Sequence, residues 1–475
     1  MASAAQAPSP VVERILKTVK ERVKWSGFDK ARLESAVARF TRAIDVVRLH
    51  YLENCVGCAE CADVCPYYAA GEIYSPVNKA ELARKIYRKR MTFAGLVLGP
   101  LVGAWMPKSE QDLDKIAEAV YRCTNCGHCY FACPFGIDSG SLVQGLLKIV
   151  ATYSGRAPTI IDFFAELERQ EAYREIKPFM DMWYGVLNEA EKAVGKRLPY
   201  DKKGADVLLL PVMTDAMFYP GGVVGAIKTL EAAGVDYTLP SEPWAFRPPI
   251  GVVVGRMDVA RDVYTKLISR IEQLQPKRVV LLDGGFPYPW LRWEASKLLG
   301  RRLSFQVLHF VELVDELIQA GKLPYEKSSE PVTWHDPCQL GRRGGVTVEP
   351  YRVMSALSTG FRPLKHRGAN SYCCGGGGGI GCLTVEMIKM MAGMLGLRLE
   401  DLVDGEKELK FIEETEKAWA KAVKRKIDEI RESGAKVVVT ACPVCIHSIA
   451  GGAKLYGLEI EVKHIAEYVG EHVKM

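Results

Sequence analysis

Short apolar runs alternate with helix-like segments along the second half of the chain. The runs ADVLLLP (205–211), IGVVVG (250–255) and PKRVVLLD (276–283) are rich in aliphatic and β-branched residues. Segments with the apolar spacing of a helix, such as 225–234 and 259–274, lie between them. Buried strands separated by helices are typical of α/β proteins, so the pattern predicts three such strands in a mostly parallel sheet.

The strand-and-helix pattern of this half recurs. The segment AKVVVTACPVC (435–445) resembles PKRVVLLDGGF (276–286), and each is followed at a similar distance by a histidine and a glutamate. These pairs are His309 with Glu312 in VLHFVELV, and His464 with Glu467 in VKHIAEYV. Self-similarity on this scale predicts two homologous α/β lobes, at 205–325 and 330–475.

The first half of the chain has helical periodicity instead, for example at 78–90 and 110–122. We expect a helical N-terminal segment at 1–50 and a helical module at 51–200. Residues 91–107 carry no charge, but glycine and proline interrupt them and they are too short to span a bilayer. Two interpretations stay open for them: a buried helix-loop, which we favour, and an apolar docking surface for a membrane subunit.

Composition narrows the class of protein. A chain of 475 residues with 48% hydrophobic and 25% charged residues is long enough for two or three ordinary globular domains. The net charge of +6, from 63 basic and 57 acidic residues, is too mild to indicate a nucleic-acid partner. No secretory signal or apolar stretch of 18 residues is recognisable, so we expect a cytoplasmic protein. Its 14 cysteines then indicate metal or redox chemistry rather than disulfides.

Eight cysteines form two copies of the pattern C-x2-C-x2-C-x3-C-P, in CVGCAECADVCP (55–66) and CTNCGHCYFACP (123–134). Three thiolates on a tight loop reach three corners of one iron–sulfur cube, and the fourth faces the other cube. Zinc sites use paired C-x2-C knuckles instead. We therefore expect two cubane [4Fe–4S] clusters, one held by Cys55, Cys58, Cys61 and Cys133 and the other by Cys123, Cys126, Cys129 and Cys65. The 57 residues between the motifs exceed the spacing of a small ferredoxin and favour a helical ferredoxin that conducts single electrons.

The other six cysteines all lie in the second predicted lobe. They occur in WHDPCQL, NSYCCGGGGGIGC and ACPVC, whereas the first lobe has LDGGFPYP where TACPVC would stand. The arrangement C-x34-C-C-G…C-x2-C resembles the CCG domain of heterodisulfide-reductase-type proteins. With the two upstream motifs, the chain is most similar to the D-type subunits of the membrane-linked heterodisulfide reductase. It is equally similar to the K-type subunits of the complex associated with dissimilatory sulfite reductase. The presence of cysteines in only one of the two lobes favours the K-type resemblance.

This resemblance implies a non-cubane [4Fe–4S] cluster on five catalytic cysteines: Cys338, Cys373, Cys374, Cys442 and Cys445. Gly375, Gly376 and Gly377 would bring backbone N–H groups close to the cofactor and leave room for a substrate. A nucleotide-binding glycine loop is disfavoured, because no G-K-[ST] follows.

Several residues near these cysteines have two possible roles. His335 and Asp336 either supply protons to a leaving thiolate or, as we favour, hydrogen-bond the backbone and fix the loop. The same two roles are open for His447. Cys382 is a sixth ligand, a redox-active thiol or, as we favour, a small buried residue. We expect His464 to pack rather than to bind metal, because its counterpart His309 lies in the lobe without cysteines.

The spacing between Cys374 and Cys442 departs from the CCG pattern. The 67 intervening residues are more than we expect for such a domain. The excess has helical periodicity and predicts inserted helices near 384–432 that reshape the mouth of the site or dock a partner.

The sequence thus predicts an α+β multidomain protein, with a helical two-cluster ferredoxin followed by two tandem α/β CCG-type lobes. The leading hypothesis is an oxidoreductase that reduces, or reversibly forms, a disulfide on a small molecule or carrier protein. Electrons would come from a membrane cytochrome b-type or quinone-reactive subunit, which would place the protein peripherally at the membrane. The iron–sulfur subunit of lactate and glycolate oxidases shares the architecture, so a pure electron-transfer subunit is the alternative. A structural assembly factor would leave the cysteine pattern unexplained.

Overall fold

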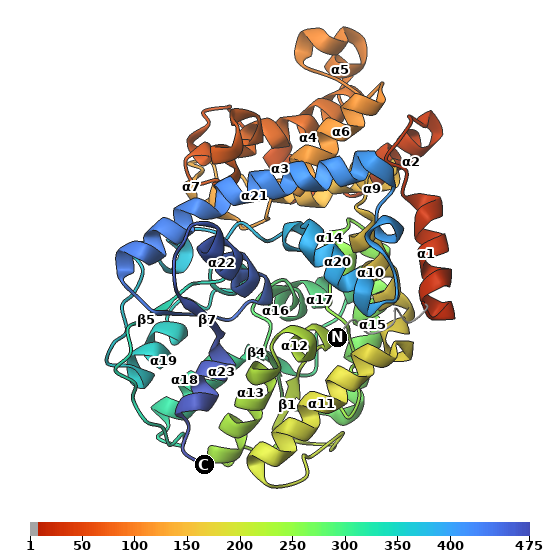
Figure 1. Ribbon diagram of the computed structural model, residues 1–475. Coiled ribbons are helices and arrows are strands. Elements are labelled where there is room, and N and C mark those ends of the chain that lie inside the picture. Colours follow the sequence, from red (N-terminus) through yellow and green to blue (C-terminus); the bar gives the residue numbers. More distant parts are fainter. Residues whose placement is uncertain (1–7) are drawn as a thin grey trace. The chain divides into compact units, whose positions relative to one another are not determined.

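The computed structural model describes residues 8–475, which fold into two compact units (Figure 1). Unit 1 comprises 8–167, Ile250–Met257 and Gly375–Val423, and unit 2 comprises Glu168–Pro249, Asp258–Cys374 and Lys424–Met475. The chain therefore passes between the units several times, whereas the sequence suggested consecutive segments. The expected helices near 384–432 are present as α20 (Val385–Met394) and α21 (Gly405–Ser433), but most of them belong to unit 1.

Unit 1 is built from helices, and its described residues contain no strand. Side-chain caps define where several of them begin: Asp29, Ser75 and Ser109 each accept a hydrogen bond from a backbone N–H of the first turn. The helices in chain order are α1 (Pro10–Arg22), α2 (Lys30–Arg42), α3 (Val46–Glu53), α4 (Pro76–Met91), α5 (Phe93–Leu98), α6 (Glu110–Tyr121), α7 (His128–Ala132), α8 (Ser139–Leu142), α9 (Lys148–Tyr153), the greater part of α10 (Thr159–Gln170), α14 (Ile250–Val253), α20 and the first part of α21.

The returning segment 375–423 is tied into unit 1 by buried polar contacts. Glu408 of α21 accepts hydrogen bonds from the backbone N–H and the hydroxyl of Thr159, both at 2.6 Å. Burial raises the pKa of the Glu408 carboxyl to about 7, against the stabilising effect of these donors. Glu408, a charged residue in a charge-rich helix, is thus buried and holds α21 against Thr159 within the unit.

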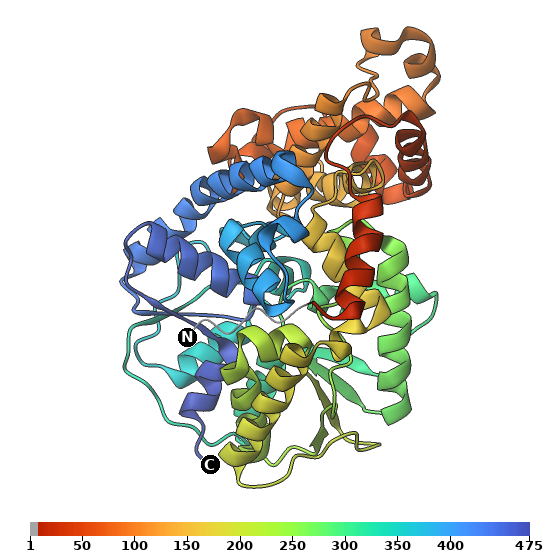
Figure 2. The same cartoon turned by 45° about the vertical axis from the view of Figure 1, so that its right-hand side comes forward.

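The apolar segment after α4 is exposed, so the expected burial of residues 91–107 is wrong. Phe93 of α5 and Leu101 of the following turn have 83% and 87% of their surface exposed. α5 folds back on the end of α4 at Gly95, where a β-carbon would overlap with the carbonyl oxygen of Arg88. The backbone of α5 and the following turn projects beyond α4 and α6 within the unit (Figure 1, Figure 2). The large apolar side chains of this segment are therefore exposed.

Unit 2 contains two parallel sheets. The first has the strand order β2-β1-β3-β4, formed by β1 (Val207–Leu210), β2 (Tyr237–Thr238), β3 (Arg278–Leu281) and β4 (Gln306–His309). The second has the order β5-β6-β7, formed by β5 (Val332–Trp334), β6 (Val437–Thr440) and β7 (Glu461–His464). All strand pairs are parallel, as the apolar runs at 205–211 and 276–283 predicted.

The third apolar run was interpreted wrongly. Residues 250–253 form helix α14 in unit 1 rather than a strand of the sheet. A short apolar run that is buried in a helix cannot be told from a buried strand by periodicity, because neither leaves a polar face. Gly255, with a φ of +77°, ends the segment against Lys148 of α9.

Helices connect the strands of unit 2 and join its two sheets. α13 (Pro220–Ala232) packs on α23 (Ile465–His472) so closely that a β-carbon on Gly470 would overlap with the backbone of Gly225 (Figure 1). The remaining helices are α11 (Lys177–Val194), α12 (Met213–Phe218), α15 (Met257–Leu274), α16 (Pro287–Pro289), α17 (Ala295–Leu299), α18 (Phe310–Gln319), α19 (Glu349–Leu357) and α22 (Pro443–Leu455).

Candidate metal centres

The first cysteine motif lies in the loop after α3. Gly57 and Ala59 adopt φ values of +74° and +66°, which turn this loop tightly between its cysteines. Burial raises the pKa of Cys61 to about 11, with further contributions from the nearby thiols of Cys133 and Cys55. The structure therefore brings the fourth cysteine of the second motif, Cys133, to the first motif.

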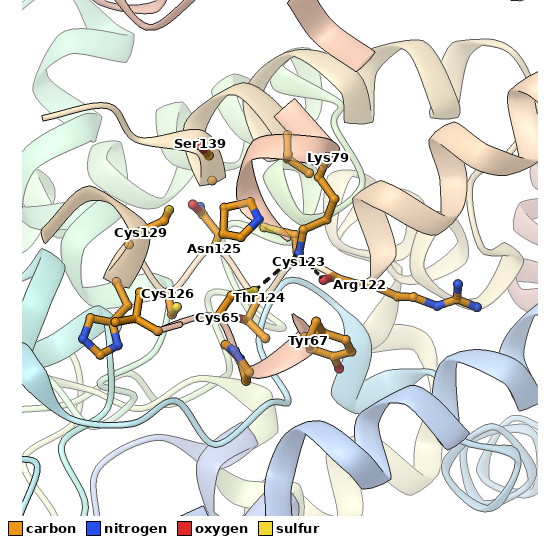
Figure 3. Close-up of a pocket in the computed structure, with 17 residues that line it drawn as sticks. Cys65, Tyr67, Lys79, Arg122, Cys123, Thr124, Asn125, Cys126, Cys129 and Ser139 are labelled. Carbon is orange, nitrogen blue, oxygen red and sulfur yellow. Dashed lines mark hydrogen bonds between the residues drawn. The ribbon is translucent and has the colours of Figure 1, made fainter. Parts of the chain in front are cut away.

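The second motif and the fourth cysteine of the first motif surround a cavity of about 30 Å³ (Figure 3). That is more than the space that one water molecule requires. Cys126 and Cys129 are buried, and their sulfurs lie with those of Cys65 and Cys123 in the lining of the cavity. Cys65 of the first motif thus lies beside three cysteines of the second motif, and the assignment of these four thiols to one cluster stays a prediction.

Two buried lysines lie next to this cavity. The ammonium of Lys79 donates to the carbonyl of Arg122 at 2.7 Å and to the sulfur of Cys65 at 3.8 Å. Burial lowers the pKa of Lys79, but the surrounding thiols, Cys65 first, outweigh burial and raise the pKa overall. Lys148 donates to the carbonyl of Gly378 at 3.0 Å, and burial lowers its pKa to about 7. Four thiols with a cationic group beside them fit an anionic iron–sulfur cluster.

The glycine run after Cys374 packs against the second cysteine motif within unit 1. A β-carbon on Gly378 would overlap with the carbonyl oxygen of Cys123, and one on Gly377 would lie 2.7 Å from the carbonyl oxygen of Thr124. Gly378 also has a φ of +69°, and the Tyr67 hydroxyl donates to the carbonyl of Gly375 at 2.9 Å. The sequence suggested that these glycines make room at the CCG cysteines. In the structure their absent side chains allow close contact with the loop of the second motif.

The CCG cysteines gather in unit 2 at the ends of β5 and β6. Cys442 precedes α22 and Cys445 lies in its first turn, while the Cys373–Cys374 pair comes from the loop after α19. A ring nitrogen of His335 and the sulfurs of Cys374 and Cys445 lie within 4.8 Å of one another, and all three residues are buried. Hydrogen bonds from the Cys373 and Cys445 thiols hold the pKa of Cys374 well below its usual value.

Cys338 follows β5, and Cys442 follows the neighbouring parallel strand β6. Both cysteines therefore lie at the same edge of the sheet. Its sulfur accepts from the Gln339 side chain at 3.8 Å. Cys382 belongs to a short turn of unit 1 that follows the glycine run.

Hydrogen bonds fix the backbone of this cysteine group. The Ser448 hydroxyl donates to the carbonyl of Cys374 at 2.5 Å, and the Thr440 hydroxyl donates to the carbonyl of His335 at 3.0 Å. Arg342 is buried and donates to the carbonyls of Ala369 and Ser371, just before the cysteine pair. Arg342 therefore holds the loop before the cysteine pair.

His335 and Asp336 have different environments. Asp336 accepts hydrogen bonds from the Trp334 indole, the Tyr351 hydroxyl and the Gly368 backbone, so it fixes the loop as we favoured. Neither ring nitrogen of His335 has a nitrogen or oxygen hydrogen-bond partner within residues 8–475, although both are buried. A buried imidazole whose hydrogen-bond neighbour is the Cys374 thiol fits a site that holds a further group, such as an iron–sulfur cluster.

Sequence reasoning missed residues that the first sheet contributes to this group. A β-carbon on Gly285, in the loop after β3, would lie 3.0 Å from the Cys442 sulfur and 3.1 Å from a guanidinium nitrogen of Arg247. Gly284 donates a hydrogen bond to the carbonyl of Ala441 at 2.7 Å. The signal in the sequence was LDGGF, which stands in the first repeat at the position of TACPVC. His447, by contrast, packs against the rings of Phe218 and Tyr219.

Comparisons with protein families match both cysteine-rich regions of the chain. A 4Fe-4S dicluster domain matches residues 51–137, and the CCG cysteine-rich domain matches 332–395 and 409–450. The chain therefore contains a 4Fe-4S dicluster domain and a CCG cysteine-rich domain. The resemblance to heterodisulfide reductases is confirmed by the D-type subunit of the dihydromethanophenazine:CoB–CoM heterodisulfide reductase of Methanosarcina barkeri. That protein is 25% identical over 91% of this chain and 96% of its own length.

Two further relatives have other names. An Hdr-like menaquinol oxidoreductase iron–sulfur subunit of Archaeoglobus fulgidus is 25% identical over 73% of this CCG-domain protein and 71% of its own length. EtfAB:quinone oxidoreductase of Syntrophomonas wolfei is 24% identical over 87% of this chain and 56% of its own length. Proteins named as oxidoreductases or their subunits thus align with most of this chain.

Proposed function

We propose that this CCG-domain protein is the subunit of a redox complex that reduces, or reversibly forms, a disulfide. The observation that carries the proposal is the buried group of His335, Cys374 and Cys445, next to Cys373 and Cys442, at the carboxyl ends of parallel strands. A single-electron carrier would need neither a fifth cysteine nor a buried histidine among the thiols.

We assign the ligands of three clusters from these positions. The first cubane cluster would be held by Cys55, Cys58, Cys61 and Cys133, and the second by Cys65, Cys123, Cys126 and Cys129. The non-cubane cluster would be held by Cys338, Cys373, Cys374, Cys442 and Cys445. When bound, the cubane clusters supply single electrons and the non-cubane cluster supplies a metal centre for sulfur.

The route of the chain supports an order for the two cubane sites. Cys374 is followed directly by Gly375, and the same glycine run contacts the Cys123–Thr124 backbone. The covalent chain therefore leads from a CCG cysteine to the second cubane site within a few residues. We infer that the second cubane site is the immediate electron donor to the CCG site and that the first lies further upstream.

The proposed reaction balances in a simple way. One disulfide takes up two electrons and two protons and gives two thiols. The electrons would come one at a time from a quinol or a reduced cytochrome on a membrane subunit, and the protons from water. The cysteine group excludes bulk water, since Cys374 and Cys445 are each only 3% exposed.

The exposed apolar loop supports a membrane partner. We propose that α5 and the following turn bind the membrane subunit through Phe93 and Leu101. Within the described residues, no helix is long and apolar enough to cross a bilayer. In this proposal the membrane partner supplies the quinone or cytochrome site.

A reductive titration tests the disulfide reaction. The cluster-loaded protein is photoreduced without oxygen, mixed with bis(2-hydroxyethyl) disulfide, and assayed for thiols while cluster absorbance is followed. We expect two thiols per disulfide consumed, loss of the reaction in Cys374→Ser, and an unchanged reaction in Cys382→Ser. Cubane clusters that still reduce in Cys374→Ser would show that this variant folds. Reoxidation of wild type by a quinone but by no disulfide would contradict the proposal.

A second candidate function is an electron relay between a flavoprotein and a quinone. The deep burial of Cys373, Cys374, Cys442 and Cys445 favours it, because a relay needs no entry for a substrate. The relative named EtfAB:quinone oxidoreductase points the same way. The quinone outcome of the titration would support this candidate.

A further inference from the structure

The loop that follows β3 lies against the cysteine end of β6. Gly284 donates to the Ala441 carbonyl at 2.7 Å, immediately before Cys442. The next residue, Gly285, has so little room that a β-carbon would lie 3.0 Å from the Cys442 sulfur. The first sheet, which carries no cysteines, thus lies against the cysteine group through Gly284 and Gly285, which form one wall of it. In the first sequence repeat these glycines stand at the positions that cysteines occupy in the second.

An arginine–aspartate pair lies behind this wall. Arg247 donates from Nε to Asp283 at 3.0 Å, and its Nη2 lies 3.0 Å from the same carboxylate oxygen. The second oxygen of Asp283 accepts from the Gly285 backbone at 2.6 Å. The Arg247 side chain keeps 18% of its surface exposed and that of Asp283 keeps 2%, so the carboxylate is the inner member of the pair.

The guanidinium of Arg247 is close to the cysteine sulfur. A β-carbon on Gly285 would lie 3.1 Å from Nη2 of Arg247 and 3.0 Å from the Cys442 sulfur. These two atoms are therefore at most about 6 Å apart. A group of one or two heavy atoms bound at the sulfur would reach hydrogen-bonding distance of the guanidinium. An arginine stays charged at every working pH, and in a water-poor site it attracts negative charge strongly.

A second carboxyl nearby does not cancel this charge. Asp215, at the start of α12, is buried, and its carboxylate accepts from the backbone of Val212 at 2.9 Å. Burial, reinforced by the negative charge of Asp283, raises the pKa of Asp215 to about 8. At neutral pH Asp215 is therefore largely protonated and adds little negative charge beside Arg247.

We propose that Arg247, held by Asp283, is the cation that stabilises the substrate thiolate at the Cys442 side of the CCG site. The inference rests on the proposed function, because it assumes that a substrate sulfur binds there. The sheet without cysteines thereby contributes a residue that touches substrate instead of a second set of ligands. In the reductive direction, each thiolate released by two-electron cleavage stays paired with Arg247 until it takes a proton from water.

The test uses two variants that break the same ion pair from opposite sides. Binding of 2-mercaptoethanol to the oxidised, cluster-loaded protein is followed by its effect on the electron paramagnetic resonance spectrum. We expect Arg247→Gln to weaken binding by about tenfold, the size of one charge-assisted hydrogen bond. Asp283→Asn leaves the guanidinium unneutralised, so we expect it to tighten binding. The reduction potential of the CCG site should fall in the first variant and rise in the second.

The controls separate this role from a structural one. Arg301→Gln, which breaks the exposed pair with Glu272 in the same sheet region, should change neither affinity nor potential. Equal losses of affinity in Arg247→Gln and Asp283→Asn would overturn the proposal, because they would reflect damage to the loop. An Arg247→Gln effect seen with 2-mercaptoethanesulfonate but not with 2-mercaptoethanol would also overturn it, since the arginine would then bind the sulfonate. A wild type indifferent to both thiols would refute the proposed function, whereas the potential shifts would still report on the pair.

Discussion

His309 and His464 both direct Nε2 at the carbonyl oxygen of Leu282, at 2.8 Å and 3.1 Å. Each also accepts a backbone N–H with Nδ1 and so caps the helix that it begins, α18 or α23. The two residues occupy the same place in the two sequence repeats. Their shared acceptor is the residue before Asp283, so the two sheets meet at the wall of the cysteine group.

These two histidines should make the protein sensitive to acid. Burial lowers the pKa of His309 to about 3 and of His464 to about 4, from an ordinary value of about 6.5. The neutral forms stabilise the fold above pH 6.5, and this contribution is lost as the pH falls toward the folded-state values. Between pH 7.5 and 5.5 each histidine should reduce the free energy of unfolding by about 1.4 kcal/mol.

Urea unfolding of the cluster-loaded protein, without oxygen and across that pH range, measures this effect. His464→Gln should lower stability at pH 7.5 and should reduce the loss of stability between pH 7.5 and 5.5 by about 1.4 kcal/mol relative to wild type. His50→Asn, at a solvent-accessible position of α3, is the matched control and should leave the slope unchanged. A His309→Gln/His464→Gln double variant with the same pH dependence as wild type would contradict this assignment.

The glycine run should tolerate no side chain where it contacts the second cysteine motif. Gly378→Ala places a methyl group against the Cys123 carbonyl and also strains a left-handed backbone. We expect loss of the second cubane cluster, measured as iron and sulfide per chain and by its paramagnetic signal. Gly393→Ala in α20 has open space around it and should keep full cluster content. Full cluster content in Gly378→Ala would show that the contact is dispensable.

Lys79 should raise the reduction potential of the second cubane cluster. Its ammonium is buried against Cys65 and stabilises added negative charge. Lys79→Gln should lower the potential by about 60 mV, which corresponds to a loss of about 1.4 kcal/mol for one electron. A redox titration followed by electron paramagnetic resonance measures the shift, with the exposed Lys108→Gln as control. An unchanged potential would mean that the Arg122 carbonyl, not the cluster, is the functional partner of Lys79.

Local patterns in the sequence were enough to predict much of this protein. The two C-x2-C-x2-C-x3-C-P motifs are short and local, so they can be recognised without knowledge of the fold. The parallel strands β1, β3 and β6 were visible because each is a short apolar run before a polar turn. The CCG cysteines could likewise be found from the short motifs HDPC, CCGGGGG and ACPVC, because each motif is recognisable without the others.

Features that depend on distant contacts escaped sequence analysis. Residues 250–253 are apolar, but only tertiary packing decides that they form a helix. The exposure of Phe93 follows from the tight return at Gly95, which periodicity does not reveal. Arg247 lies 195 residues before Cys442 in the chain, and no local pattern connects the two.

The exposed loop should be required for binding to the membrane subunit and for nothing else. Phe93→Ser/Leu101→Ser removes two large apolar side chains from a surface that already faces water, so cluster content and unfolding should stay unchanged. We expect the variant to separate from membranes of the producing organism that retain wild type. Trp293→Ser, an exposed aromatic residue of unit 2, is the control. Equal retention of the double variant would exclude the loop as the docking surface.

The central claim is that a substrate sulfur binds at the CCG cysteines. The most direct measurement is the electron paramagnetic resonance spectrum of the oxidised, cluster-loaded protein, recorded without oxygen and with and without added thiols. We predict a new signal that appears only with thiol, is lost in Cys374→Ser, and persists in Cys382→Ser. A spectrum that no thiol changes, including a thiol on a carrier protein, would contradict the disulfide chemistry and leave the electron relay as the function.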